Sequence, residues 1–158
     1  MNRSRFDRCP GVLRPWPASD GLLVRLRLPG GHVTSPQLLP LLEVAERHGD
    51  GRVHVTTRAN LQVRGLPATS GTGHLTEEVV EAIEATGLLP SRTHDLARNI
   101  MASPQTGLSG GRADLRPVAR ALDAALQGEP ELGSLPGRFL FVLDDGRGDL
   151  LDRTCDLG

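Results

Sequence analysis

The sequence V-T-T-R-A-N-L-Q-V-R-G at residues 55–65 is typical of two short β-strands joined by a tight turn. Side chains alternate between the two faces of a strand, so this stretch has one apolar face and one polar face. The apolar face would comprise Val53, Val55, Leu61 and Val63, and the polar face His54, Thr56, Asn60, Gln62 and Arg64. We expect the apolar face to rest on a core and the polar, cationic face to bind a large anion.

The flanking segments predict the other elements of an α+β domain. These are a strand at 22–28, a helix at 34–48, the strand pair at 52–57 and 60–65, and a helix at 76–87. Thr34 or Ser35 is expected to cap the first helix, because short hydroxyl side chains accept hydrogen bonds from free amides of the first turn. The order strand, helix, strand, strand, helix resembles a ferredoxin-like split βαβ arrangement.

The remainder of the chain has weaker patterns. Residues 88–113 are predicted as loop, 114–127 as a helix and 138–143 as a buried strand. Residues 1–20 are rich in Arg and Pro and are predicted to be irregular. We therefore expect an N-terminal arm at 1–20, a first domain at 21–88 and a further α/β segment at 89–158.

Composition excludes several classes of function. The 158 residues carry a formal net charge of −1, so bulk attraction to nucleic acid is not expected. The two cysteines, Cys9 and Cys155, and the five scattered histidines lack metal-ligand spacing, so no metal site is predicted. No segment is apolar enough to cross a membrane and the N-terminus does not resemble a signal peptide, so we expect a cytoplasmic protein.

Every basic residue is an arginine, because all 18 Lys and Arg positions hold Arg. The planar guanidinium group of arginine can form paired hydrogen bonds with carboxylates and phosphates, and it keeps its charge at any ordinary pH. Arg25, Arg27, Arg58 and Arg64 could therefore form an anion cradle, or they could be a solvated strand face that protects a sheet edge from aggregation. Arg98 and Asn99 lie in a predicted loop, where both types also serve as simple turn formers.

Three segments together resemble the nitrite/sulfite reductase superfamily. The first is T-T-R-A-N-L-Q-V-R-G at 56–65, the second A-R-N-I-M-A-S-P-Q-T-G at 97–107, and the third V-R-L-R-L-P-G-G-H-V-T at 24–34. The resemblance implies a ferredoxin-like half-domain followed by an α/β segment of the nitrite/sulfite reductase fold, a partial sirohaem/[4Fe-4S] domain. Within the superfamily, C-P-G-V-L-R-P at 9–15 and L-P-G-R-F-L-F-V-L-D-D-G-R-G-D at 135–149 are most similar to the precorrin-3B synthases of cobalamin biosynthesis.

The resemblance implies an oxidoreductase that binds a tetrapyrrole, either a precorrin substrate or sirohaem, together with a [4Fe-4S] cluster. It assigns an anion or substrate contact to Arg58 and, at the start of the strand at 138–143, to Arg138. The implied tetrapyrrole contacts are Arg25, Arg27, Arg58, Asn60, Gln62, Arg64, Arg98 and Asn99.

Two departures from the family pattern qualify this prediction. Neither cysteine matches the C-x5-C…C-x3-C cluster motif, so we expect an N-terminal half that is inactive alone and that self-associates or needs a C-terminal half and an electron donor. Gly137 stands where the reductases carry an active-site arginine, which favours the precorrin branch over nitrite or sulfite reduction. A sirohaem-dependent nitrite/sulfite reductase part and a non-catalytic tetrapyrrole-binding or assembly module remain the alternatives.

Overall fold

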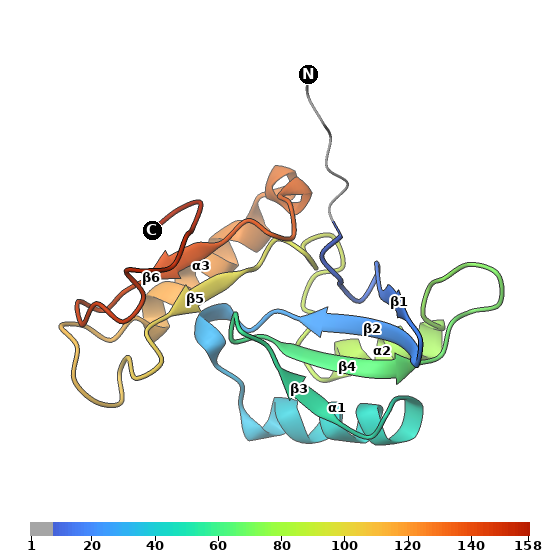
Figure 1. Ribbon diagram of the computed structural model, residues 1–158. Helices are drawn as coiled ribbons and strands as arrows, with labels where there is room; N and C mark the ends of the chain where they lie inside the picture. Colours follow the sequence, from blue (N-terminus) through green and yellow to red (C-terminus); the bar gives the residue numbers. More distant parts are fainter. Residues whose placement is uncertain (1–7) are drawn as a thin grey trace.

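A computed structural model describes residues 8–158 of the protein. A four-stranded antiparallel sheet forms its first half (Figure 1). The strand order is β1-β2-β4-β3, and the strands are β1 (Trp16–Ala18), β2 (Gly21–Leu26), β3 (Val53–Val55) and β4 (Leu61–Leu66). Arg25 of β2 and His54 of β3 both lie opposite Gln62 of the central strand β4. The register therefore sets polar residues from three strands in one row.

Two helices cover the opposite face of this sheet. The helix α1 (Ser35–His48) begins with a capping box, in which Thr34 and Gln37 exchange hydrogen bonds, and continues through Pro40. The helix α2 (Glu77–Ala85) packs beside it. Their buried side chains, which include Leu41, Val79 and Ile83, join Val24 and Val63 of the sheet in one core. Burial of this apolar layer is the main term that holds the first unit together.

A second unit follows and has its own core. The strands β5 (Ile100–Ala102) and β6 (Phe141–Leu143) pair in parallel, and α3 (Arg116–Gly128) crosses between them in sequence, followed by the 3-10 helix η2 (Pro130–Ser134). Ile100, Ala119, Leu126 and Phe141 form the centre of this core. The strand–helix–strand order explains the parallel pairing, because parallel strands need a long crossover.

The two units meet at the short 3-10 helix η1 (Pro29–Gly31), which contacts both β5 and α3. Gly30 has a φ of +71°, and a Cβ atom there would lie 3.2 Å from Cβ of Ala119. Glycine is therefore required twice, for the left-handed backbone and for the close approach of α3.

Most predicted elements are confirmed, and two strands were missed. The strands at 22–28, 52–57, 60–65 and 138–143 and the three helices are present with shifts of a few residues. The predicted irregular arm contains β1, and the predicted loop at 88–113 contains β5. Residues 1–7 of the arm lie outside the described residues. The predicted domain boundaries at residues 20 and 88 stay a prediction. Val12 and Leu89 lie outside the predicted domain 21–88, and both belong to the first core.

No helix in the described part of the chain has the length and apolar character needed to cross a bilayer.

Candidate functional site

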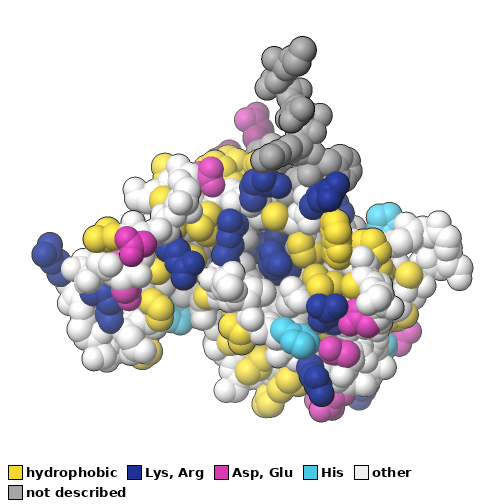
Figure 2. All heavy atoms as spheres, viewed as in Figure 1, with side chains coloured by type: hydrophobic (Ala, Val, Ile, Leu, Met, Phe, Trp, Pro, Cys, Tyr) yellow, Lys and Arg dark blue, Asp and Glu magenta, His cyan; other side chains and the backbone are white. Residues whose placement is uncertain are grey.

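The face of the sheet that the helices leave free presents the polar side of β2, β3 and β4. Arg25, His54, Gln62 and Arg64 are each partly exposed on this face. Figure 2 shows dark blue arginine side chains gathered across the middle of the molecule, where the sheet meets the second unit. The expected alternation is present in β4, whereas Val55 of β3, predicted on the apolar face, is 79% exposed.

Arg25 carries a buried polar atom without a hydrogen-bond partner. Its Nε is buried and no acceptor lies within hydrogen-bonding distance among the described residues. Buried hydrogen-bond donors are nearly always paired, because a donor that loses its hydration without gaining a partner destabilises the folded state. A cationic donor in this state on a partly open face is a reason to expect an acceptor from a bound molecule.

The turn between β3 and β4 brings Arg58 to the second unit. The Thr56 amide donates to the Asn60 carbonyl, and the Thr56 carbonyl and Oγ1 accept the amides of Ala59 and Asn60. Ala59 has a φ of +53°. Nη1 of Arg58 donates to the carbonyl oxygen of Arg138 at 3.1 Å. The two residues with a predicted substrate contact are thus neighbours, although 80 positions separate them.

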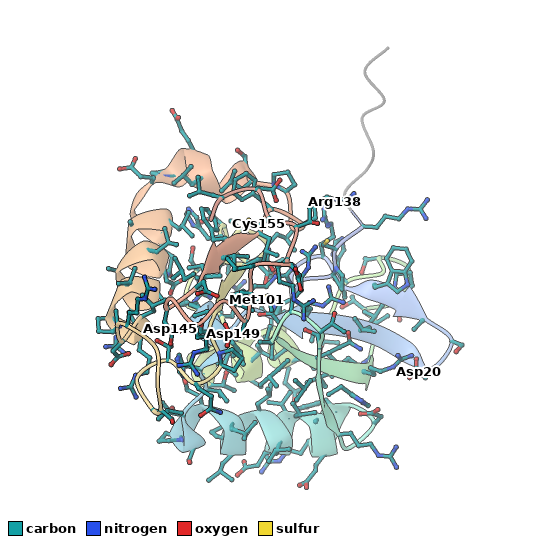
Figure 3. All side chains as sticks on the ribbon, turned by 60° about the vertical axis from the view of Figure 1, so that its left-hand side comes forward. Asp20, Met101, Arg138, Asp145, Asp149 and Cys155 are labelled. Carbon is teal, nitrogen blue, oxygen red and sulfur yellow. The ribbon has the colours of Figure 1, made fainter. Side chains whose placement is uncertain are left out.

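Arg138 and Arg64 mark the two ends of this face. Figure 3 shows Arg138, which precedes β6, well apart from Asp20, which lies in the turn between β1 and β2. Arg64 forms a bidentate ion pair with Asp20, in which Nε and Nη2 of Arg64 lie 3.1 and 3.2 Å from the two carboxylate oxygens of Asp20. This hydrogen bonding from Arg64 is the main reason that the pKa of Asp20 is lowered. A ligand would therefore compete with Asp20 for Arg64, whereas among residues 8–158 the Arg58 side chain bonds only to a backbone carbonyl.

Arg27 is buried, contrary to the expectation of a ligand-facing side chain. It is 2% exposed, and Nη1 donates to the carbonyl oxygens of Pro10 and Arg25 at 2.6 and 2.9 Å. Its Nε donates to Oδ1 of Asn99 at 3.2 Å. The residues around Pro10 and Asn99 cover this end of the sheet, so the alternation of β2 no longer leads to solvent here.

Asn60 and Asn99 are likewise buried, and each connects neighbouring segments by hydrogen bonds. Oδ1 of Asn60 accepts the backbone amide of Leu28 at 2.9 Å, which extends the hydrogen bonding between β2 and β4 beyond their ends. Nδ2 of Asn99 donates to the carbonyl oxygens of Leu96 and Gly137, both at 2.9 Å. Both asparagines were predicted to contact the tetrapyrrole. The structure directs the Asn60 side chain to the backbone, and that of Asn99 to the backbone and to Arg27.

Arg98 points away from the open face towards α3. Its Nε and Nη2 bind the carboxylate of Asp123 at 2.6 and 2.9 Å, and its side chain is 7% exposed. The expectation of a contact on the same face as Arg64 is therefore corrected for Arg98. Arg25, Gln62 and Arg64 lie on the free sheet face, and Arg58 contacts the backbone of Arg138. The structure buries Arg27, Asn60, Arg98 and Asn99 inside the protein.

Asp95 is a structural residue that the sequence reasoning missed. Its Oδ2 accepts the backbone amides of Val12 and Leu13 at 2.6 and 3.0 Å, which holds the N-terminal arm against the loop before β5. Burial raises the pKa of this carboxyl above its usual range, although the two amides and nearby Arg27 act in the opposite sense. The sequence around Asp95 contains no signal for this contact, which spans more than 80 positions.

The donor set suits an anionic organic group and not a metal cluster. Guanidinium and amide donors pair with carboxylates by charge-assisted hydrogen bonds. Among residues 8–158 there is no group of three or more His, Cys, Asp or Glu side chains placed to hold a metal ion. No disulfide joins Cys9 and Cys155.

Comparison with known proteins places this arrangement in a family. Residues 17–70 match the family model described as the nitrite/sulfite reductase ferredoxin-like half domain. A ferredoxin–nitrite reductase of Synechococcus elongatus is 37% identical over 132 residues, which is 79% of this chain and 25% of that protein. A precorrin-3B synthase of Sinorhizobium is 34% identical over 145 residues, or 90% of this chain and 29% of that protein.

A sulfite reductase hemoprotein β-component of Methylocella silvestris is 37% identical over 103 residues, which is 62% of this chain and 16% of that protein. The chain therefore spans roughly a quarter of the length of the first two relatives. The matched region contains the whole four-stranded sheet except the first residue of β1. The chain belongs to the nitrite/sulfite reductase superfamily, and it corresponds to the N-terminal part of those proteins.

Proposed function

We propose that this chain supplies one wall of a tetrapyrrole site in an oxidoreductase of the precorrin-3B synthase type. The observation that carries the proposal is the buried, unpaired Nε of Arg25 on a face that also presents Gln62, Arg64 and Arg58. A macrocycle with several carboxylates would meet these donors along its edge. Its carboxylates would provide the acceptors that this face lacks.

The residues of this face would bind and orient the macrocycle. Arg58 is the best placed, because among residues 8–158 its side chain bonds only to the Arg138 carbonyl and it is partly exposed. Arg64 would exchange Asp20 for a carboxylate of the ligand. When bound, sirohaem would supply redox chemistry at the site, whereas a precorrin would be the substrate that is oxidised there. The cluster and the electron donor would come from outside residues 8–158, because the described residues hold no such metal site.

The precorrin branch is preferred because the similarity to the precorrin-3B synthase extends over 145 residues, against 132 for the nitrite reductase. Gly137, where the reductases of the family pattern carry an arginine, is buried and uses its carbonyl to accept Asn99. The identities do not separate the branches, since the nitrite reductase is 37% identical and the synthase 34%. Sirohaem-dependent reduction of nitrite or sulfite is therefore the second candidate.

Titration of the purified chain with sirohaem, followed by the shift of its main absorption band, tests the proposal. We expect Arg58→Gln to weaken binding by about tenfold or more, the effect of losing one charge-assisted hydrogen bond of roughly 1.5–3 kcal/mol. Arg153→Gln is the matched control, because Arg153 is an exposed arginine near the C-terminal end. Equal affinities of wild type, Arg58→Gln and Arg153→Gln would favour the view that these arginines are a solvated face.

A further inference from the structure

A cleft of about 400 Å³ lies on the other side of the molecule from the free sheet face, at the N-terminal end of α1. Thr34 and Gln37 of that end form one wall, Gly87 and Pro90 after α2 form another, and α3 forms the third. The cleft therefore lies between the two units, close to the η1 turn.

The wall contributed by α3 is cationic. Arg116 and Arg120 are one helical turn apart on the same helix face, and both line the cleft. Like charges at this spacing destabilise a helix, and positive charge is also unfavourable in a first turn because the helix dipole is positive there. The first turn of α3 contains no acidic residue to offset this charge.

Only part of this charge is neutralised within the protein. Asp114 binds Arg116 through two hydrogen bonds of 2.8 and 2.9 Å, and Asp123 binds Arg98 at the base of the cleft. Arg120 is exposed, and within residues 8–158 it makes no side-chain hydrogen bond or ion pair. Three arginines thus share two carboxylates, which leaves the cleft with an excess positive charge.

His32 lies within the field of the same arginines. Its pKa is lowered from the ordinary value first by burial and then by the charges of Arg116 and Arg120, while Asp114 acts in the opposite sense. His32 is therefore mostly neutral at pH 7. An anion in the cleft would oppose the two arginines and raise this pKa, so binding would be accompanied by uptake of a proton.

The N-terminal end of α1 adds to the positive field of the cleft. Its first turn has no acidic residue, and the helix dipole is positive at this end. The side-chain Nε2 of Gln37, which lines the cleft, makes no hydrogen bond among residues 8–158, so it can donate to an oxygen of a tetrahedral anion.

We propose that this cleft binds the phosphate group of a small phosphorylated molecule, with Arg120 as the principal cationic contact and Arg116 beside it. The volume of about 400 Å³ exceeds that of a bare ion, so it admits an organic group attached to the phosphate. This site is separate from the proposed tetrapyrrole face and does not depend on it.

Titration with sulfate tests the proposal, because the charge of sulfate is constant across the pH range in which His32 titrates. Two-dimensional ¹H–¹⁵N NMR at fixed ionic strength reports both the affinity and the place of binding. We expect saturable shifts at Gly30, Gly31 and the first turn of α3, a weakening of about tenfold or more in Arg120→Gln, and no change in Arg153→Gln. Affinity should increase as the pH falls from 8 to 5.5.

Two further arms make the result decisive. Acetate at the same ionic strength should bind more weakly than sulfate, since one singly charged carboxylate cannot use both arginines and the Gln37 side chain. Arg120 is exposed, so the variant should keep the dispersed spectrum of the wild type. Equal losses in Arg120→Gln and Arg153→Gln, unsaturable shifts, or shifts confined to β2 and β4 would each overturn the cleft, and the last would leave the tetrapyrrole proposal intact.

Discussion

Replacing Arg98 with Gln separates a structural role from a ligand-binding role for this residue. The family resemblance assigns Arg98 to the tetrapyrrole, whereas the structure shows it bound to Asp123 at 2.6 and 2.9 Å. An arginine that binds ligand can be removed with little loss of stability. An arginine that completes a buried ion pair cannot, because the carboxylate stays behind without its partner.

The size of the loss follows from the burial of the pair. The side chains of Arg98 and Asp123 are 7% and 16% exposed. Removing one partner of a buried pair costs about 3–5 kcal/mol. Asp123 would keep its hydrogen bond from Nε2 of Gln127 at 2.9 Å, so we expect the lower end, about 3 kcal/mol. For a protein of this size that corresponds to a decrease in Tm of roughly 6–12 °C.

Urea denaturation followed by circular dichroism at 222 nm measures this loss directly. Arg64→Gln is the matched control, since Arg64 makes the same two-pronged contact with Asp20 but at the surface, where the side chains are 35% and 41% exposed. Its midpoint should stay close to that of the wild type. A double-mutant cycle with Asp123→Asn should give a favourable coupling. If Arg98→Gln is no more destabilising than Arg64→Gln, then the ion pair is not structural and the assignment to ligand binding regains its force.

Two other expectations follow from the same structure. Gly30→Ala should be more destabilising than Gly51→Ala. Both positions have φ above +70°, which costs an alanine roughly 1–2 kcal/mol, but only at Gly30 does the new Cβ also meet Ala119, at 3.2 Å, which adds about 1 kcal/mol. Equal unfolding midpoints for the two variants would show that α3 adjusts freely. Because the pKa of Asp95 is raised in the folded state, this carboxyl binds its proton more tightly when folded, and its contribution to stability decreases as pH rises from 3.8 through the folded pKa. In Asp95→Asn that part of the pH dependence should disappear, and urea titrations at several pH values that give parallel curves for wild type and variant would contradict the shift.

The elements with strong local patterns could be predicted from the sequence. The first helix was placed within a residue of its observed bounds, because Thr34, Pro36 and the closing Gly49 each act on neighbouring backbone. The strand β5 was missed because its three residues are all buried and lack alternation, and its partner β6 lies about 40 positions further on. A strand this short is defined by its pairing and not by its own sequence.

The division of the arginines into exposed and buried sets could not be predicted in the same way. Alternation along β2 correctly assigns Arg25 and Arg27 to one side of the strand, but it contains no information on what covers that side. Distant segments decide this, because the arm at Pro10 and the loop at Asn99 both reach Arg27. The candidate site was therefore predicted in composition, while the part of it open to a ligand had to come from the tertiary structure.

The buried residues nevertheless position the exposed ones. Arg27 holds Asn99, and Asn99 in turn holds the carbonyl of Gly137, the residue before Arg138. Arg58 then reaches the Arg138 carbonyl from the β3–β4 turn. Four sequence segments that resemble the family are thus connected by these hydrogen bonds, which end at Arg58 and Arg138 near the surface. Similarity of sequence alone gives the same weight to every residue that they join. Burial separates them: substitution of Arg58 should alter ligand affinity alone, whereas substitution of Asn99 should lower stability and displace Arg138 as well.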